Sequence, residues 1–212
     1  MKRIAILLFI GLGYTGISFG QGTSTQAAIE FTNAGIKLYE EKQFMEAIVS
    51  FNSAIEADPG YFQAYFFRAN IKRDFEDIHG AMKDYNKTLE VNPDFSEAYY
   101  ERGNIKFALQ DYYGAIDDYS KAIERNENHV QAYFKRGQAK QQLEAYQDAI
   151  NDCTKILEIN HDNVDAYYLR GVLRIEYGDL QAGCLDLSKA GELGDLKSYE
   201  VIREKCNSSC LN

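Results

Sequence analysis

The chain has 212 residues, of which 45% are hydrophobic, so it can bury an ample core and one folded domain is expected. Its 23 Lys and Arg residues stand against 32 Asp and Glu residues, a formal net charge of −9. A negative field of this kind repels phosphate backbones and anionic lipid headgroups, which excludes nucleic acid and the membrane surface as expected main partners. A protein or peptide partner that is neutral or basic where it touches the chain fits the charge better.

Residues 1–20 have the pattern of an export signal. Lys2 and Arg3 precede an uninterrupted apolar run from Ile4 to Ile10, and Ser18-Phe19-Gly20 is a small-x-small triplet. We expect cleavage after Gly20 and a mature protein that is periplasmic or secreted. The alternative is an uncleaved membrane anchor, which glycines at 11, 13, 16 and 20 disfavour because they weaken a spanning helix. No cysteine lies near the triplet, so lipid modification is not expected.

Residues 21–27 are small and polar, and we expect a flexible lead there. From Ala28 onward a pattern returns every 34 residues: Ala64-Tyr65-x-x-Arg68-Ala69 is followed by Ala98-Tyr99-x-x-Arg102-Gly103, Ala132-Tyr133-x-x-Arg136-Gly137 and Ala166-Tyr167-x-x-Arg170-Gly171. A fixed period of this length indicates a stacked array of one supersecondary unit. The array divides into five repeats, at 28–61, 62–95, 96–129, 130–163 and 164–193.

Each repeat is predicted to be a helix, a tight turn and an antiparallel helix. In repeat two, apolar and recurring residues have the spacing of one helical face in both halves, from Tyr65 to Lys72 and from Ala81 to Leu89. Turn-prone residues such as Glu76-Asp77 and Gln110-Asp111 separate the halves. One such pair of helices cannot cover its own apolar face, so neighbouring pairs must stack.

With this pattern, the chain resembles tetratricopeptide repeat proteins from Ala28 to about Leu193. Repeats two to five are similar to the subgroup written Ala-Tyr-x-x-Arg-Gly-x-x-Lys, which is common in exported bacterial repeat proteins. The resemblance implies an all-α fold, a right-handed α-α superhelix (a solenoid) of five helix-turn-helix repeats, with a capping helix and tail at 194–212. Departures from the pattern, which affect local packing, are Ala69, Cys153, Ile156, Arg174, Gly183 and Gly191.

A correlation between two positions predicts structural ion pairs. The seventh position of repeats two to five is arginine and the twenty-third is aspartate, whereas repeat one lacks both and has Ala34 and Ser50. In an antiparallel hairpin these positions lie at similar heights, so we expect a partly buried pair inside each repeat or between a repeat and its predecessor. The alternative is four pairs of solvated charges. The residues are Arg68 and Asp84, Arg102 and Asp118, Arg136 and Asp152, and Arg170 and Asp186.

The last third of the chain holds all four cysteines, at 153, 184, 206 and 210. A final helix from Leu196 to about Lys205, capped by Asp195, would cover the end of repeat five with Leu196, Tyr199, Ile202 and Cys206. Antiparallel packing of that helix would bring Cys206 near Cys184, and this is the disulfide we favour among the possible pairings. Cys153 is then a buried apolar residue. A metal site is disfavoured, because no histidine accompanies the cysteines and no Cys-x-x-Cys pair exists.

No catalytic constellation stands out in the sequence. The three histidines, His79, His129 and His161, lie near turns or helix ends without a partner at ligand spacing, and no phosphate-binding loop, zinc-binding helix motif or nucleophile elbow is present. We therefore expect a protein that is not an enzyme and that needs no cofactor or metal.

The resemblance also implies where a partner binds. In this family the first helices line a concave surface, which their second, fifth, ninth and twelfth positions face. Aromatic rings and amides at such positions suit an extended peptide, although the rings can instead pack between neighbouring helices. Carried over to this chain, the candidate residues are Gln63, Phe66, Asn70, Tyr100, Asn104, Phe107, Gln131, Phe134, Gln138 and Tyr168.

A carboxylate clamp for chaperone C-termini, another activity of this family, is not expected. It needs lysine, arginine and asparagine at set positions, and most of the matching residues here differ: Phe66, Asn70, Glu101, Gln131 and Lys135. Two hypotheses follow. The chain is a protein-protein interaction scaffold that binds a peptide or protein segment on its concave face, or it is a structural subunit of a larger cell-envelope assembly.

Overall fold

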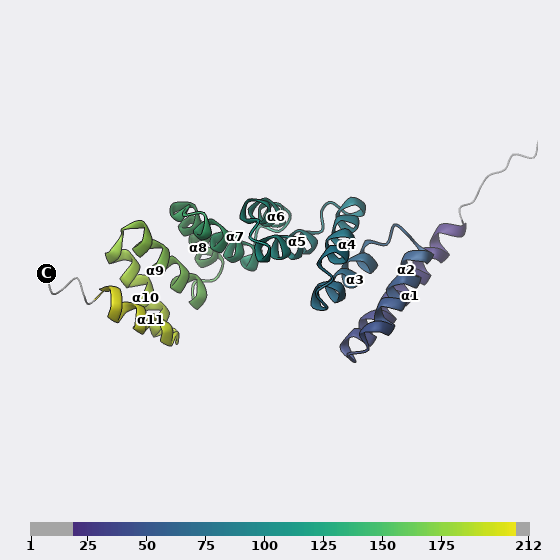
Figure 1. Ribbon diagram of the computed structural model, residues 1–212, viewed down its shortest axis with the longest axis horizontal. Coiled ribbons are helices and arrows are strands. Elements are labelled where there is room, and N and C mark those ends of the chain that lie inside the picture. The colour runs from purple at the N-terminus through teal and green to yellow at the C-terminus, as the bar shows by residue number, and fades with distance from the viewer. Residues whose placement is uncertain (1–18, 207–212) are drawn as a thin grey trace, which may run out of the picture. The chain divides into compact units, whose positions relative to one another are not determined.

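The computed structural model describes residues 19–206, and within that range it contains eleven α-helices, one π-helical turn and no strand (Figure 1). The chain divides into two compact units, one that ends at Tyr61 and one that begins at Phe62. None of the helices in the described range combines the length and the apolar character needed to span a bilayer.

The N-terminal unit is a hairpin of α1 (Phe19–Glu40) and α2 (Phe44–Ala57). The two helices approach closely where Gly35 faces Phe51, because a Cβ on this glycine would lie only 2.6 Å from the Phe51 ring. Ala28, Ala47 and Phe51 are almost fully buried and form the centre of the hairpin. Small residues at the crossing thus let one bulky ring fill the space between the helices.

The predicted flexible lead at 21–27 is instead part of α1. Its polar side chains have partners that fix the helix: Thr25 Oγ1 donates to Asp58 Oδ2 at 2.7 Å, and Gln26 Nε2 donates to Glu30 Oε1 at 3.0 Å. The first of these bonds spans 33 residues and could not be read from local composition. Residues 1–18 of the predicted export signal lie outside the described residues, and Phe19 and Gly20 begin α1.

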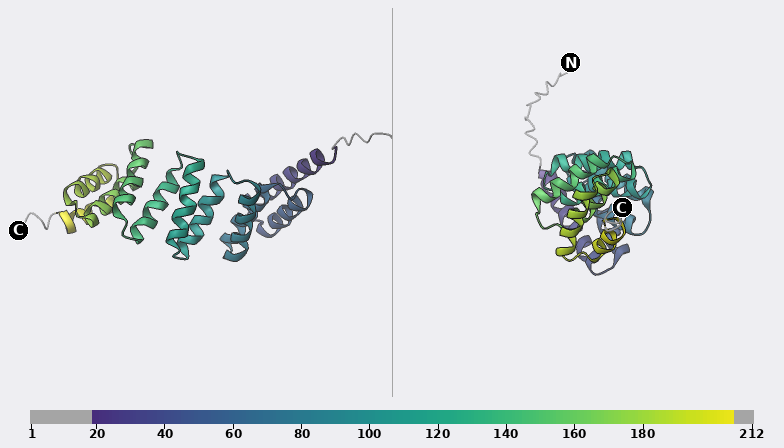
Figure 2. Two further views of the ribbon diagram at one scale, coloured as in Figure 1. Left: turned by 90° about the horizontal axis from the view of Figure 1, so that it is seen from above. Right: turned by 90° about the vertical axis from the view of Figure 1, so that its left-hand side faces the viewer.

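The C-terminal unit consists of four helix pairs and a terminal segment. In chain order its helices are α3 (Phe62–Asp74), α4 (Ile78–Val91), α5 (Ser96–Ala108), α6 (Tyr112–Arg125), α7 (Val130–Gln142), α8 (Tyr146–Ile159), α9 (Val164–Tyr177) and α10 (Leu180–Glu192). Each helix contacts the next along the chain, so the pairs stack into a solenoid (Figure 2).

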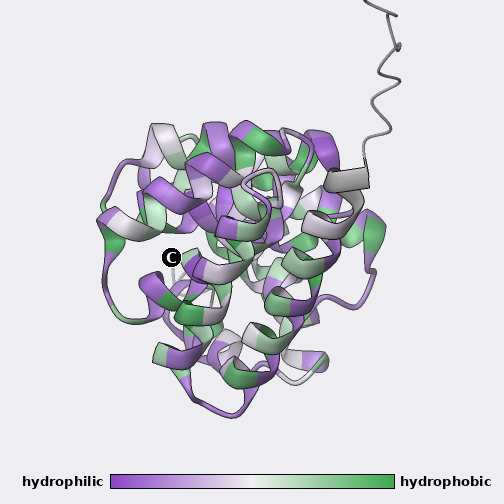
Figure 3. Ribbon diagram, turned by 90° about the vertical axis from the view of Figure 1, so that its right-hand side faces the viewer, coloured by the Kyte–Doolittle hydropathy of each residue, from purple (hydrophilic) through white to green (hydrophobic). Residues whose placement is uncertain are grey.

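The helices of this unit are amphipathic and share one kind of core. Across the described residues, hydrophobic and hydrophilic residues occur together along single helices (Figure 3). Ala81, Ala115 and Ala149, one period apart, are fully buried, and so are the rings of Tyr85 and Tyr119. Small residues therefore mark the helix crossings of repeats two to four, and in repeats two and three a tyrosine ring fills the space beside the crossing.

Recurring turns separate the two helices of each pair. Asp77, Asp111 and Asp179 cap the second helices by accepting a hydrogen bond from a backbone N–H three residues on. The residue before Asp179 is Gly178, with φ of 100°, whereas Gln110 takes the same left-handed conformation at φ of 61° before Asp111. The backbone of the turn is thus kept even where no glycine supports it.

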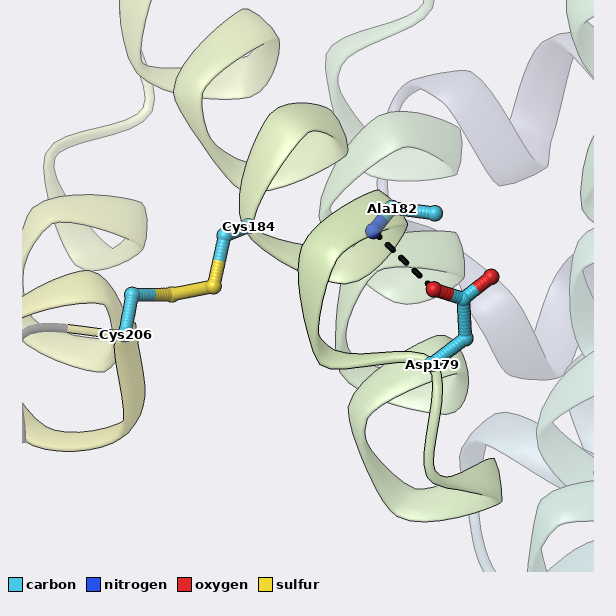
Figure 4. Close-up of a disulfide and its surroundings, with 4 residues drawn as sticks. All are labelled: Asp179, Ala182, Cys184 and Cys206. Atoms are coloured by element: carbon cyan, nitrogen blue, oxygen red, sulfur yellow. Dashed lines mark hydrogen bonds between the residues drawn. A yellow bond between two sulfur atoms is a disulfide. The ribbon is translucent and has the colours of Figure 1, made fainter. Parts of the chain in front are cut away.

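The C-terminal end is a short helix, α11 (Leu196–Val201), followed by a π-helical turn, η1 (Ile202–Cys206). Cys206 forms a disulfide with Cys184 of α10, with the two Cα atoms 6.1 Å apart (Figure 4). The predicted apolar cover is incomplete, because Leu196 is 77% exposed and Tyr199 is 53% exposed. The buried residue of α11 is Ser198, whose hydroxyl donates to the capping carboxylate of Asp195.

Candidate functional site

Each of the four predicted Arg and Asp pairs forms within its own repeat, as a bidentate ion pair. In repeat three, Arg102 Nε and Nη2 donate to the two oxygens of Asp118 at 2.9 and 2.6 Å, and Lys106 Nζ lies 2.7 Å from Asp118 Oδ2. The aspartate side chain is fully buried. The same two-cation arrangement holds Asp84, Asp152 and Asp186. Two cations and good geometry offset the desolvation of the carboxylate.

The arginine of each pair also links its repeat to the one before. Arg102 Nη1 donates to Asn86 Oδ1, Arg136 Nη1 to Ser120 Oγ and Arg170 Nη1 to Thr154 Oγ1, at 2.7 to 3.2 Å. Each of these arginines further lies over the tyrosine three residues before it, as Arg102 lies over Tyr99 at 5.5 Å. One side chain thus joins two repeats, which fixes how neighbouring pairs stack.

The first-helix face, by which we mean the surface formed by α3, α5, α7 and α9, carries the predicted partner-binding residues. None of the ten is fully buried, and Gln131 is exposed. Tyr100, Gln131 and Phe134 line one pocket, and Phe107 lies under the ammonium group of Lys135. Gln63 is half-buried, and its Oε1 has no hydrogen-bond partner among the described residues. Gln138 and Tyr168 are half-buried on α7 and α9.

Two of the predicted amides are engaged inside the protein. The buried Tyr85 hydroxyl donates to Asn70 Oδ1 at 2.6 Å, and the buried Tyr119 hydroxyl donates to Asn104 Oδ1 at 2.9 Å. Burial raises the pKa of both tyrosines, so both hydroxyls stay protonated as donors. Phe66 is likewise engaged, because it packs edge-on against Phe95 at 4.9 Å. Asn70, Asn104 and Phe66 thus contribute to the packing of repeats two and three.

An ion pair between Arg73 and Glu101 crosses this part of the face. Arg73 Nη1 on α3 donates to Glu101 Oε2 on α5, and Asn104 Nδ2 donates to the same oxygen at 3.2 Å. Burial alone would lower the pKa of Arg73, but Tyr85, Glu101 and Asp74 together raise it. The polar groups between α3 and α5 therefore satisfy one another.

A pocket of about 220 Å³ opens between α5, α7 and α9. Its walls are Tyr100, Val130 and Phe134, and its rim carries Gln131, Lys135, Asn163 and Asp165. A space of this size is smaller than a typical small-molecule site and suits a single side chain of a larger ligand. We call this the α5–α7–α9 pocket. In the α3–α5 region described above, the polar groups bond to one another or to buried tyrosines, whereas this pocket presents aromatic rings beside rim groups of both charges.

His129 supports one wall of this pocket. It is the N-cap of α7, and its Nδ1 accepts a hydrogen bond from the backbone N–H of Ala132 at 3.3 Å. Its ring also stacks against Tyr100, with centroids 4.9 Å apart. Burial lowers the pKa of His129, and this outweighs the opposite effects of Glu97, of its bond with Gln131 and of Glu101. The neutral imidazole thus holds both Tyr100 and the start of α7.

The free cysteine of the described residues is not a candidate nucleophile. The Cys153 thiol is buried and free, and desolvation raises its pKa to about 12, which keeps it protonated and unreactive. Within residues 19–206, no group of three or more His, Cys, Asp or Glu side chains is placed to hold a metal ion.

The structure adds residues that the sequence interpretation missed. The Tyr and Asn bonds had a signal: tyrosine at the twenty-fourth position and asparagine at the ninth occur together in repeats two and three. Both are absent in repeat four, which has Cys153 and Gln138, and in repeat five, which has Leu187 and Val172. The pairing of Arg73 with Glu101 and the support of Tyr100 by His129 occur once each, so no repeated pattern marks them.

Family models match the centre of the chain. Residues 62–95 and 130–163 match one model of the tetratricopeptide repeat, and residues 96–129 match another. Residues 62–163 thus match the tetratricopeptide repeat, three repeats in a row. They include α3 to α8 and both the α3–α5 region and most of the α5–α7–α9 pocket. No curated protein matches the sequence.

Solved structures share the fold at low sequence identity. YrrB, described as a TPR protein with an unusual peptide-binding site, is 21% identical, with a TM-score of 0.73 over 84% of this chain and 92% of its own. MamA is 22% identical, with a TM-score of 0.71 over 84% of this chain and 95% of its own. The first TPR of Spaghetti (RPAP3), bound to the HSP90 peptide SRMEEVD, is 27% identical, with a TM-score of 0.54 over 56% of this chain and 94% of its own. The chain thus shares the solenoid fold of these structures.

Proposed function

We propose that the protein is a non-catalytic interaction scaffold that binds an extended segment of a partner protein on its first-helix face, the concave face expected of such a solenoid. The observation that carries the proposal is the α5–α7–α9 pocket, where Tyr100 and Phe134 leave room for one side chain. Aromatic anchors beside amides are typical of peptide-binding surfaces. Two of the similar structures, YrrB and the RPAP3 repeat, are described as having a peptide-binding site or a bound peptide.

The binding segment would lie across α7 and reach α5 and α9. Gln131, at the rim, can both donate to and accept from a peptide backbone, and Tyr168 extends the aromatic surface along α9. The α3–α5 region contributes less, because Asn70, Asn104 and Glu101 already bond within the protein. We also propose that residues 1–20 direct export, so that this binding takes place in the periplasm or outside the cell.

Site-specific crosslinking in intact cells tests the proposal. A photoreactive residue replaces Gln131 at the pocket rim, and a matched variant carries it at Asp117, which is exposed on α6. We expect one partner segment to crosslink at position 131 and not at 117, and a synthetic copy of that segment to bind the purified protein. Binding that persists in Tyr100→Ala and Phe134→Leu variants, with unchanged helix content, would contradict the proposal.

Export is tested separately by N-terminal sequencing of the protein recovered from the envelope fraction and the medium. We expect a mature chain that starts at Gln21. A chain found in the cytoplasm with residues 1–20 intact would contradict export without affecting the binding proposal. A stoichiometric partner that copurifies through many washes would favour the alternative, a permanent subunit of an envelope assembly.

A further inference from the structure

A second hollow lies where the second helices of repeats three and four end. Its volume is about 440 Å³, and none of its lining residues is shared with the α5–α7–α9 pocket. We call it the α6–α8 groove. Ile123, Tyr133 and Ile159 form its apolar lining, and Ile159 is 40% exposed at the end of α8. The groove thus offers apolar surface that the proposed binding site does not use.

The polar lining of the α6–α8 groove is acidic. Glu124, Glu127 and Glu158 line it together with one lysine, Lys155, which pairs with Glu158 at 2.6 Å. The helices α6 and α8 both end there, and the carbonyl groups at a helix C-terminus add partial negative charge. These carboxylates are not placed to hold a metal ion. The groove therefore attracts a cation that is larger than a metal ion and that also carries apolar atoms.

The equivalent place one repeat earlier shows which cation fits. Moved back by 34 residues, Ile159 corresponds to Arg125 and Asn128 corresponds to Asp94. Arg125 Nε donates to Asp94 Oδ1 at 3.0 Å, and its Nη1 donates to Glu124 Oε2 at 3.2 Å. The side chain of Arg125 is only 32% exposed. An arginine of the protein itself thus joins the end of α6 to the loop that follows α4.

The α6–α8 groove lacks this arginine but keeps a carboxylate for it. Ile159 takes the position of the arginine, and Glu127 takes the position that is Pro93 one repeat earlier. Glu124 and Glu158 each bond to a neighbouring basic side chain, whereas Glu127 has none within 4.0 Å among residues 19–206. Glu127 is therefore the carboxylate that remains for a ligand.

The equivalent place one repeat later is also occupied by the chain itself. His161 lies at the position of Glu127 there, and its Nδ1 donates to the backbone carbonyl oxygen of Leu157 at 2.6 Å. The imidazole thus covers the end of α8. At the ends of their second helices, both neighbouring places hold a nitrogen-bearing side chain, Arg125 or His161, where the α6–α8 groove has Ile159 and Glu127.

We propose that the α6–α8 groove binds an arginine side chain of a partner protein, in the place that Arg125 takes one repeat earlier. The aliphatic part of this arginine would lie on Tyr133 and Ile159, and its guanidinium group would bond to Glu127. A guanidinium group suits the site because it bonds to a carboxylate through two N–H groups and is more weakly hydrated than an ammonium group. The protein then has a second interaction surface, in addition to the first-helix face.

Selection of displayed random nonapeptides on the purified protein, at physiological salt, tests this inference. We expect the wild type to enrich arginine. In Ile159→Arg the protein's own arginine takes the place of the ligand, so this enrichment should be lost, whereas Ile159→Leu should keep it. Glu127→Gln should weaken the binding of an enriched peptide about tenfold, which is the loss of one charge-assisted hydrogen bond. Glu127 is exposed, so this second variant leaves the packing unchanged.

Matched substitutions control for charge. Gln147→Arg adds the same charge as Ile159→Arg at an exposed site on α8, and Glu46→Gln removes the same charge as Glu127→Gln at an exposed site on α2. Both controls should behave as wild type. No arginine enrichment, or enrichment that changes equally in the groove variants and their controls, overturns the inference. Enrichment lost in Tyr100→Ala but kept in Glu127→Gln overturns it too, and leaves the proposed function in place.

Discussion

Repeats two and three differ from repeats four and five at the positions where the second helix meets the first-helix face. We call repeats two and three the first half and repeats four and five the second half. Both halves keep the same ion pairs, from Arg68 with Asp84 to Arg170 with Asp186. In repeats two and three, however, a buried tyrosine bonds to an asparagine of that face, whereas Cys153 and Leu187 carry no hydroxyl at the same position. The repeated residues thus fix the stacking of the helix pairs, and the variable ones decide which side chains of the first-helix face bond within the protein.

Because both halves contain the same ion pairs, breaking a pair should lower the free energy of unfolding by the same amount in each half. Asp118→Ala leaves two partly buried cations without a counter-ion and should lower the free energy of unfolding by about 3 kcal/mol, and Asp152→Ala by a similar amount. Urea titration followed by circular dichroism measures both. Asp117→Ala, on the exposed side of α6, should cost less than about 0.5 kcal/mol. An effect of Asp118→Ala as small as that of Asp117→Ala would contradict a structural role.

The disulfide is a feature of the second half alone. Cys184 and Cys206 are 22 residues apart, and closing a loop of this length stabilises a protein by about 3 kcal/mol in the chain-entropy model. The Cys184→Ala/Cys206→Ala double variant should therefore lose protection from hydrogen exchange in α10 and α11. Amides of α3 to α6 should keep their protection. An equal loss of protection in α3 to α6 and in α10 and α11 would mean that the disulfide does not stabilise the second half in particular.

The tyrosine bonds are a feature of the first half alone. Tyr119→Phe removes the donor to Asn104 and should lower the free energy of unfolding by about 1 kcal/mol. Tyr113→Phe is the matched control, because this tyrosine lies on the same helix, α6, and is 77% exposed. A double-mutant cycle with Asn104→Ala gives the coupling directly. Additive effects of the two substitutions would show that the hydroxyl and the amide do not depend on each other.

His129 lies where the halves meet, and its titration should have the smallest effect. Because burial lowers its pKa below the ordinary value of about 6.5, the unfolded chain binds the proton more readily than the folded one. The cap on α7 therefore contributes fully above pH 6.5 and is lost as the pH falls through the lower folded value, a loss of at most about 1 kcal/mol. The melting temperature of the wild type should therefore fall as the pH is lowered below 6.5.

His129→Asn provides the control for that pH dependence. Asparagine can cap α7 but does not titrate, so the difference in melting temperature between variant and wild type should grow as the pH falls below 6.5. The groups that face His129 are Glu97, Glu101 and Gln131, and their charges are the same in both proteins. Parallel curves for the two proteins would show that His129 does not contribute.

Most of the fold could be predicted because it repeats. The 34-residue period predicts the helix pairs, and the joint absence of Arg and Asp in repeat one indicates the ion pairs. The predicted flexible lead was wrong, because local composition does not reveal contacts such as the bond of Thr25 to Asp58, 33 residues away. The predicted partner-binding residues included Tyr100, Gln131 and Phe134 of the pocket but not its other lining residues. A spacing on one helix also could not show that Tyr119 reaches Asn104 from another.

The most direct test of the central claim is an NMR titration of isotope-labelled protein with the partner segment found by crosslinking. The account predicts that chemical shift changes gather on residues of the α5–α7–α9 pocket, such as Tyr100, Gln131, Phe134 and Asp165. Amides of α4, α6 and α11 should remain unchanged. Shift changes gathered instead on the exposed apolar residues Leu185, Leu196 and Tyr199 would contradict it.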